Sequence, residues 1–449
     1  MHREISVYSV SLGCPKNLVD TERLLGALGP SYRPARSPEE AELILVNTCS
    51  FLESAVEESV ETILTLVSET EDMARRPFIV VTGCLVARYT IAELQQELPE
   101  VDLWLGLEEQ SGWKHRLAEH VHGLLAGRAG ALQPGRTEAQ AVPRVLSTPP
   151  GTAYLKVSEG CNHSCAFCLI PSIRGPLRTA PASALLAEAR ELLARGVQEL
   201  VLVGQDVASY GRDRGGRREL HRLLQSLAGL AGLTWLRLMY LYPSGLTTEL
   251  LSVLRDISPP LLPYFDVPLQ HAHPEILSSM GRPFAGDPRR VIDRIRSTFP
   301  QASLRTSLIV GYPGETEAHY RALRDFVKEA GMQHVGVFAF SPEEATPAAE
   351  APDQVEEEVK EERRQELMEL QAGISRDLLA GYRGRSLDVL VDRPHPEWPT
   401  LYEGRSWFQA PEVDGLTYIS GSRLVPGRMV RATVEQTWDY DLSTLSEAG

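Results

Sequence analysis

Three cysteines stand within eight positions of the sequence, in the stretch EGCNHSCAFCLIPSIRG at residues 159–175. Cys161, Cys165 and Cys168 have the spacing C-x3-C-x2-C. A structural zinc site normally takes four ligands, commonly from paired cysteines. His163 is awkwardly placed to be the fourth ligand, because it lies inside the first cysteine interval. Three thiolates favour a [4Fe–4S] cluster instead and leave one iron without a protein ligand. A substrate or cosubstrate can bind at that iron.

The remaining cysteines, Cys14, Cys49 and Cys84, each come just after a short apolar run. If these runs are parallel strands, their carboxyl ends share one edge, the usual ligand site of an open α/β sheet. We therefore expect the three thiolates to converge and to hold a second [4Fe–4S] cluster. The alternative is three buried structural cysteines, because free cysteine is commonly buried and inert. The runs are ISVYSVSL at 5–12, ELILVNT at 42–48 and PFIVVTG at 77–83.

Length and composition indicate a multidomain globular protein. A chain of 449 residues suggests two or three domains. Its 23% charged and 43% hydrophobic residues are typical of soluble proteins. The amino terminus lacks the pattern of a signal peptide, and no run approaches the apolar length of a membrane span. We expect a cytoplasmic protein, in which cysteines are ligands or reactive thiols more often than disulfides.

The chain divides into five predicted segments. Residues 1–126 alternate apolar runs with helical patterns, which predicts an amino-terminal domain built on an open parallel α/β sheet. Residues 127–149 are rich in Gly, Ala and Pro and are predicted to be a linker. Residues 150–351 contain six β/α units, which predict a partial (β/α)6 barrel with its active site at the carboxyl ends of the strands. The six candidate strands are 153–158, 199–204, 234–241, 263–269, 304–311 and 334–340.

The last two segments differ from the rest. Residues 352–381 form a long charged helical pattern, which we interpret as a helix that bridges domains. Residues 382–449 change to short strand-like runs punctuated by Gly and Pro. This pattern predicts a small antiparallel β-barrel of OB-like type.

The first cysteine loop resembles that of the radical S-adenosylmethionine enzymes. It follows the candidate strand AYLKVS directly, and Phe167 supplies the aromatic residue before the last cysteine. The resemblance implies that the open iron chelates S-adenosylmethionine. Reductive cleavage then releases a 5′-deoxyadenosyl radical, so the cofactor performs the difficult step and the protein positions it.

Other stretches narrow the resemblance to the methylthiotransferases, a subgroup with two clusters. SLGCPKNLVDTE at 11–22, VNTCSF at 46–51 and VTGCL at 81–85 resemble their amino-terminal domain, and the carboxyl-terminal barrel resembles their TRAM domain in place and size. The resemblance implies that an auxiliary cluster on Cys14, Cys49 and Cys84 holds the sulfur to be delivered. A second S-adenosylmethionine would supply the methyl group. No catalytic side chain beyond the cluster ligands is expected.

Two branches of this family compete. One modifies the β-carbon of an aspartate in small-subunit ribosomal protein twelve, and the other modifies an adenosine of tRNA. Four stretches resemble the ribosomal-protein branch, while the tRNA branch usually has a Q-S-G-S run in place of Gln270–His273. We expect the ribosomal protein, met on the ribosome or its subunit, as the partner, with an external electron donor and a sulfur source. The four stretches are 13–22, 168–175, 267–277 and 336–348.

Charge gives an independent argument. The whole chain has a net charge of −15, and residues 386–449 contain no lysine and five arginines against ten acidic residues. This is the wrong sign for a module that binds RNA phosphates, so nucleic acid is not expected as the substrate. Complementary charge instead favours a basic protein. The alternative is an ordinary solvated surface. The acidic residues are Asp388, Asp392, Glu397, Glu403, Glu412, Asp414, Glu435, Asp439, Asp441 and Glu447.

Polar residues and glycines at the predicted strand ends are further candidates. Gly204, Asp206 and Gln270 are expected to contact S-adenosylmethionine or substrate, although a polar residue at a strand end is often only a loop cap. The segment 311–316 lacks the GK[ST] ending of a phosphate loop, so nucleotide hydrolysis is not expected. A function of another class, a non-catalytic iron–sulfur or zinc scaffold, would hold metal without cleaving S-adenosylmethionine.

Overall fold

The computed structural model describes residues 4–29, 32–107, 144–216, 218–282 and 287–447. The chain divides into two units, which are treated separately below. Unit 1 contains residues 1–147 together with 169–175, and unit 2 contains residues 148–168 and 176–449. Most of the predicted linker, residues 127–143, lies outside the described residues.

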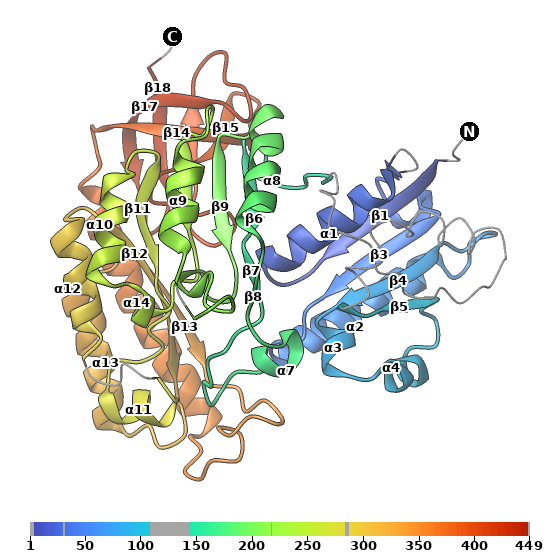
Figure 1. The fold of residues 1–449 in the computed structure, drawn as a ribbon, viewed down its shortest axis with the longest axis horizontal. Helices are drawn as coiled ribbons and strands as arrows, with labels where there is room; N and C mark the ends of the chain where they lie inside the picture. Colours follow the sequence, from blue (N-terminus) through green and yellow to red (C-terminus); the bar gives the residue numbers. More distant parts are fainter. Residues whose placement is uncertain (1–3, 30–31, 108–143, 217, 283–286, 448–449) are drawn as a thin grey trace. The chain divides into compact units, whose positions relative to one another are not determined.

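Unit 1 is built on a five-stranded parallel sheet with the order β2-β1-β3-β4-β5, coloured blue to cyan in Figure 1. Its strands are β1 (Ile5–Ser11), β2 (Tyr32–Pro34), β3 (Leu43–Thr48), β4 (Phe78–Gly83) and β5 (Leu103–Leu105). Its helices are α1 (Pro15–Ala27), α2 (Glu53–Thr70), α3 (Leu85–Arg88), α4 (Ile91–Glu97) and α7 (Ile170–Arg174), with a short 3-10 turn at Pro38–Glu40.

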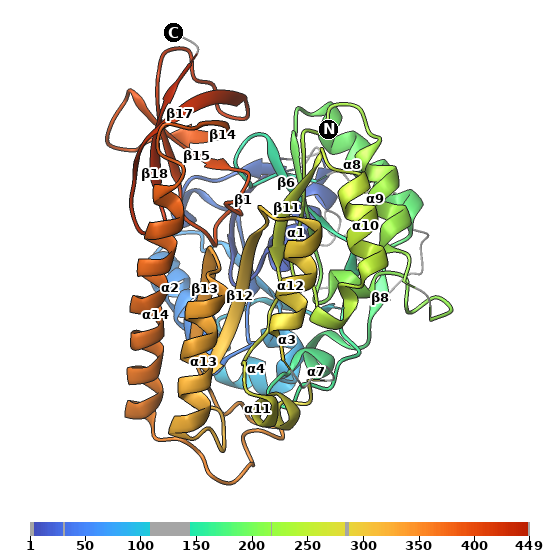
Figure 2. The same cartoon turned by 90° about the vertical axis from the view of Figure 1, so that its left-hand side faces the viewer.

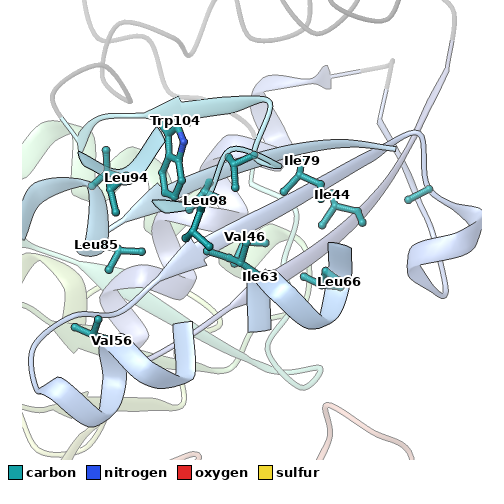
Figure 3. Packing of buried hydrophobic residues seen from close by; sticks show 14 residues of the cluster. Ile44, Val46, Val56, Ile63, Leu66, Ile79, Leu85, Leu94, Leu98 and Trp104 are labelled. Atoms are coloured by element: carbon teal, nitrogen blue, oxygen red, sulfur yellow. The ribbon is translucent and has the colours of Figure 1, made fainter. Parts of the chain in front are cut away.

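The two faces of this sheet carry separate hydrophobic cores. Along β3, Leu43 and Leu45 join one cluster with residues of α1, while Ile44 and Val46 join the other with residues of α2. Figure 3 shows the second cluster, with Ile63 from α2 packed near Val46. Successive strand residues face opposite sides. A parallel sheet covered on both faces therefore gives the continuous apolar runs seen in the sequence.

Unit 2 contains a six-stranded parallel sheet with the order β13-β12-β11-β10-β9-β6. Its strands are β6 (Thr152–Lys156), β9 (Glu199–Val203), β10 (Trp235–Leu238), β11 (Leu261–Asp266), β12 (Ser303–Val310) and β13 (His334–Ala339). The intervening helices are α8 (Ala182–Ala194), α9 (Leu220–Ala228), α10 (Thr248–Asp256), α11 (Pro274–Ser279), α12 (Arg289–Thr298) and α13 (Glu317–Ala330). A separate two-stranded antiparallel sheet pairs β7 (Ser158–Glu159) with β8 (Arg178–Thr179).

Helix α14 (Glu357–Ala380) connects the sheet to the carboxyl-terminal barrel and runs along β13 in Figure 2. Buried residues recur at every fourth position from Arg363 to Leu379, which places them on one side of the helix. Arg363 donates to Glu315 Oε1 at 2.7 Å, and Gln371 donates to the Met332 carbonyl at 2.9 Å. Although its sequence is highly charged, this helix therefore has a line of buried residues along one side.

The last five strands close a barrel in the order β14-β15-β16-β18-β17. Its pairs are antiparallel except for β16 with β18, which are parallel. These features confirm the predicted fold class of an open parallel α/β sheet, a parallel six-stranded partial barrel and a small closed β-barrel. The strands are β14 (Ser386–Pro394), β15 (Leu401–Ser406), β16 (Thr417–Ser420), β17 (Met429–Thr437) and β18 (Leu442–Ser446).

A buried charge network joins this barrel to the parallel sheet of unit 2. Arg405 of β15 donates to Glu199 Oε2 of β9 at 2.6 Å and to Asp392 Oδ2 at 2.8 Å. Arg237 of β10 donates to Glu199 Oε1 at 2.8 Å and to the Trp407 carbonyl at 2.8 Å. Burial alone would raise the pKa of Glu199, but Arg405 and Arg237 outweigh burial and hold that pKa below its ordinary value.

We predict that Arg405→Leu destabilises the protein strongly, because Glu199 and Asp392 lose their shared cation in a buried site. Breaking a buried ion pair costs about 3–5 kcal/mol. The matched control is Arg431→Leu, which breaks the exposed pair with Asp388 and should change stability by less than about 1 kcal/mol. Urea unfolding followed by circular dichroism measures both variants. Equal effects would contradict the role assigned to the network.

Candidate metal centres

The first centre lies at the carboxyl edge of the unit 1 sheet. Cys14, Cys49 and Cys84 directly follow or adjoin the ends of β1, β3 and β4, which are neighbours in the sheet. A hydrogen bond with Cys84 and burial raise the pKa of the Cys49 thiol well above its ordinary value, and the charge of Cys14 raises it further. The three cysteines therefore lie at one edge of the sheet, and their role as ligands of one shared cluster stays a prediction. Because thiolates repel one another when buried, this set needs a cationic group to be ionised together.

A buried amide and a buried hydroxyl hold the ends of β1 and β3 in place. Asn17 donates from Nδ2 to the carbonyls of Leu12 at 3.0 Å and Thr48 at 2.9 Å. Ser59 Oγ accepts from the Cys49 N–H at 3.1 Å and donates to the Cys49 carbonyl at 2.7 Å. Sequence reasoning did not single out Asn17 or Ser59. Asn17 stands only three residues after Cys14, but its contact with Thr48 and that of Ser59 with Cys49 are visible only in the folded chain.

A glycine precedes two of these cysteines because no side chain fits there. Gly13 has φ +82°, and a Cβ at this position would lie 2.7 Å from Cys49 Cβ and 2.8 Å from Cys49 Sγ. Gly83 has φ +105°, and its Cβ would lie 2.4 Å from the Thr48 carbonyl oxygen. The backbone thus approaches closely to bring the thiols together. Three convergent, partly buried thiols fit a cluster bound by three protein ligands.

The second centre lies in unit 2, in the loop after the β7 strand. A turn from the Cys168 N–H to the Cys165 carbonyl, at 3.1 Å, brings these two residues together. Burial raises the pKa of Cys161, while the His163 N–H, 3.4 Å from Cys161 Sγ, acts in the opposite direction. The Ala166 N–H donates to the Met280 carbonyl at 3.1 Å and anchors the loop. This set of thiols also fits a cluster with three protein ligands.

The His163 side chain is held by other groups. Its Nε2 lies 2.8 Å from Asp206 Oδ2, and its ring stacks on Tyr242 with 3.6 Å between ring centroids. The Asp206 carboxylate and the Tyr242 ring therefore fix the orientation of His163 beside the cysteine loop.

The positively charged side chain of Arg282 lies close to the loop. Arg282 Nη1 is 3.4 Å from Cys165 Sγ, and Arg282 Nη2 donates to the Pro268 carbonyl at 2.6 Å. The guanidinium also lies 4.3 Å from the centroid of the Tyr242 ring. A cation beside a ligand thiolate stabilises its charge. Sequence reasoning missed this residue, because Arg282 is more than a hundred positions away from Cys165.

The other predicted contact residues take different positions. Gly204 is required by packing, because a Cβ there would lie 2.4 Å from Ser158 Oγ. Gln270 has φ +73°, and its backbone continues the sheet by bonding to Ser307 and Ile309. Asp206 accepts from His163, from Ser209 Oγ at 2.5 Å and from the Tyr242 N–H at 3.3 Å. Direct contact with S-adenosylmethionine stays a prediction for all three predicted residues.

A cavity of about 350 Å³ adjoins this centre. Its volume lies within the range of small-molecule sites. Its wall is formed by Cys161, Asn162, His163, Leu177, Asp206, Ser209, Arg212, Gly216 and Ser244. The cavity therefore offers a polar site beside a cysteine of the second centre.

Comparison with known families assigns the class. Residues 155–327 match the model of the radical SAM superfamily, residues 384–444 match the TRAM domain, and residues 6–106 match a family described as uncharacterized protein family UPF0004. The radical S-adenosylmethionine methyltransferase TsrM from Kitasatospora setae has a similar fold, with a TM-score of 0.53 at 15% identity over 90% of this chain and 77% of that chain. The cysteine loop and the parallel partial barrel are thus those of a radical SAM protein.

Relatives identify the family within this class. A protein named ribosomal protein uS12 methylthiotransferase RimO from Nitratidesulfovibrio vulgaris is 56% identical over 98% of this chain and 100% of its own length. RimO proteins of Lawsonia intracellularis and Syntrophus aciditrophicus are 50% and 44% identical, each over 98% of both chains. The chain belongs to the RimO family of radical SAM methylthiotransferases, which confirms the ribosomal-protein branch predicted from the sequence. Among the described helices, none has the length and apolar character required to cross a membrane.

We predict that Gly13→Ala lowers the iron content of the first centre, because the new methyl group collides with Cys49. The control is Gly29→Ala, since Gly29 also has a positive φ, of +55°, but among the described residues no atom beyond its chain neighbours lies within 4 Å of its Cβ position. Both variants carry about 1–2 kcal/mol of backbone strain, and only the first carries the collision. Iron and sulfide analysis after anaerobic reconstitution measures the difference. Equal iron in both variants would refute the close-approach argument.

Proposed function

We propose that this enzyme adds a methylthio group to the β-carbon of an aspartate in ribosomal protein uS12, using S-adenosylmethionine and two [4Fe–4S] clusters. The observation that carries the proposal is the pair of three-cysteine centres, each at the carboxyl end of parallel strands. When bound, the cluster at Cys161, Cys165 and Cys168 supplies the electron that cleaves S-adenosylmethionine, and the cluster at Cys14, Cys49 and Cys84 supplies a binding position for the transferred sulfur. The relatives' names support the substrate.

The side chains around the second centre have binding and orienting roles in this proposal. Three cysteines leave one iron position open to the amino and carboxylate groups of S-adenosylmethionine. Asp206 fixes His163 and the Tyr242 backbone, so that the wall of the adjacent cavity keeps a defined shape. Arg282 supplies positive charge at Cys165. Together these residues bind and orient the cosubstrate.

The remaining partners are inferred from the chemistry. A reductive cleavage needs an external electron donor, and repeated turnover needs a sulfur source. We propose that the enzyme meets uS12 in the cytoplasm, on the ribosome or its subunit.

The barrel carries the surface that we assign to substrate docking. Four rings form a continuous series on it, which we call the aromatic patch: His395, Trp398, Tyr418 and Trp438. His395 stacks on Trp398 at 4.8 Å and lies 6.0 Å from Tyr418, which lies 6.4 Å from Trp438, all measured between ring centroids. The side chains of Trp398 and Trp438 are 59% and 46% exposed. Exposed tryptophans of this kind are typical of binding surfaces.

Two carboxylates, those of Asp441 and Glu403, act on the Tyr418 ring of this patch, and Glu403 is itself paired with Arg393. Burial raises the pKa of Tyr418, and the nearby charges of Asp441 and Glu403 raise it further. Aromatic faces combined with carboxylates attract lysine and arginine side chains through cation–π and ionic interactions. We therefore infer that the patch binds a basic segment of uS12.

The structure also refines the charge argument. Asp392 and the carboxylate of Asp414 are buried and paired, with Arg405 and Arg305 respectively. They contribute to the attachment of the barrel and not to its outer surface. Deleting residues 386–449 would accordingly leave Glu199 without Arg405, so point substitutions on the patch are the cleaner test.

We predict that replacing Cys161, Cys165 and Cys168 with Ala abolishes release of 5′-deoxyadenosine and leaves the first cluster loaded. Replacing Cys14, Cys49 and Cys84 should preserve that release and stop sulfur insertion. Wild type should contain about eight irons and each triple variant about four, as two [4Fe–4S] clusters require. Iron analysis and mass spectrometry of uS12 provide the measurements. Sulfur insertion by the second triple variant would disprove the division of labour.

We also predict that the double variant Trp398→Ala, Trp438→Ala raises the KM for uS12 at least about tenfold, since each hot-spot residue contributes about 2 kcal/mol to binding. Cleavage of S-adenosylmethionine without uS12 should be unchanged. Val425→Ala is the control, because Val425 is another exposed apolar residue of the barrel, at 52% exposure. An unchanged KM in the double variant would contradict docking of a basic protein segment. So would a double variant that loses binding to a tRNA anticodon stem-loop and keeps its KM for uS12.

A further inference from the structure

Arg174, the last residue of α7, is directed at a cysteine of the first centre. It is buried, with 6% of its surface exposed, and belongs to unit 1 together with Cys84. Its Nη2 lies 3.0 Å and its Nε 3.3 Å from Cys84 Sγ. Its Nη1 contacts Asp20 Oδ2 at 3.4 Å, and its Nη2 also donates to Asn17 Oδ1. One guanidinium therefore contacts a thiol, a carboxylate and an amide.

The contact with Arg174 suits a sulfur that binds iron, because an iron-bound cysteine sulfur carries negative charge. Neutral sulfur is a weak hydrogen-bond acceptor, and burying a guanidinium costs several kcal/mol unless its donors meet good acceptors. Two N–H groups approach the same sulfur. A negative charge on Cys84 Sγ makes both contacts charge-assisted, which is the stronger form. The same negative charge is needed for binding to iron.

The local sequence fixes Arg174 in this position. Pro171 stands in the first turn of α7, and Gly175, with φ +71°, follows its last residue. The helix is therefore limited to five residues. Leu169 and Ile173 pack with Cys84 in one buried cluster. The short helix is held by its apolar side, and Arg174 extends from its end to the thiol.

We propose that Arg174 is a positioning residue of the auxiliary centre, which donates hydrogen bonds to the Cys84 sulfur and raises the reduction potential of the cluster bound there. Hydrogen bonds to the sulfurs and net charge are two of the factors that set the potential of an iron–sulfur cluster. Removing a cation and two N–H donors makes addition of an electron less favourable. The inference rests on the proposed function, because it requires a cluster on Cys14, Cys49 and Cys84.

The test uses the full chain with Cys161, Cys165 and Cys168 replaced by Ala, so that only the auxiliary cluster contributes to the signal. Redox titration followed by electron paramagnetic resonance then compares Arg174 with Arg174→Gln and Arg174→Lys. The midpoint potential should fall in the glutamine variant and fall less in the lysine variant, which keeps the charge. Arg144→Gln is the control, since Arg144 is an equally buried arginine of unit 1 that pairs with Glu22.

Each outcome decides the matter. An unmoved potential in Arg174→Gln, or an equal fall in Arg144→Gln, overturns the inference and leaves the two-cluster proposal intact. Arg174→Gln can also fail to bind iron. In that case, iron bound by both Arg174→Lys and Arg144→Gln supports the role of the positive charge. Loss of iron from all three variants overturns the inference. Absence of iron from the chain with Arg174 intact overturns the proposed function, and the inference with it.

Discussion

The parallel direction of the strands is the constraint on which both centres depend. In each sheet every carboxyl end lies along one edge, so residues that follow the strands meet although they are far apart in sequence. Cys14, Cys49 and Cys84 converge for this reason, and the loop after β6 and β7 brings Cys161 to the corresponding edge of the other sheet. The glycines Gly13, Gly83 and Gly204 allow the backbone to approach neighbouring residues closely near these strand ends.

A second organising interaction operates inside unit 2. The buried carboxylate of Glu199 lies between Arg405 of the barrel and Arg237 of the sheet and accepts hydrogen bonds from both. Asp414 of the barrel accepts hydrogen bonds from Tyr264 and Arg305 of the sheet. The barrel is thus fixed by charges that water does not reach, and its outer rings remain available for another molecule. Acidic residues in this region serve two purposes, and only those outside the network can influence a basic partner.

Much of this architecture could be predicted from the sequence, because it rests on local patterns. Apolar runs marked the strands of both sheets, and the cysteines at their ends predicted the convergence of three thiols. The rest depends on contacts between distant positions. Arg174 and Arg282 contact cysteines that are about a hundred residues away in sequence, which no spacing reveals. The acidic count over residues 386–449 could not separate Asp392 from exposed carboxylates, and the close contact between Gly204 and Ser158 is also visible only in the folded chain.

Helix α7 has a consequence for how the protein is made. The chain leaves unit 2 after Cys168, contributes residues 169–175 to unit 1, and returns to unit 2 at Pro176. The amino-terminal unit is therefore not a continuous piece of the gene product. As the polypeptide emerges from its amino terminus at about 5–20 residues per second, the sheet of unit 1 is synthesised early, yet its last helix follows the first strands of unit 2. Folding of the two units is accordingly interleaved in time, and no single cut in the chain separates one complete unit from the other.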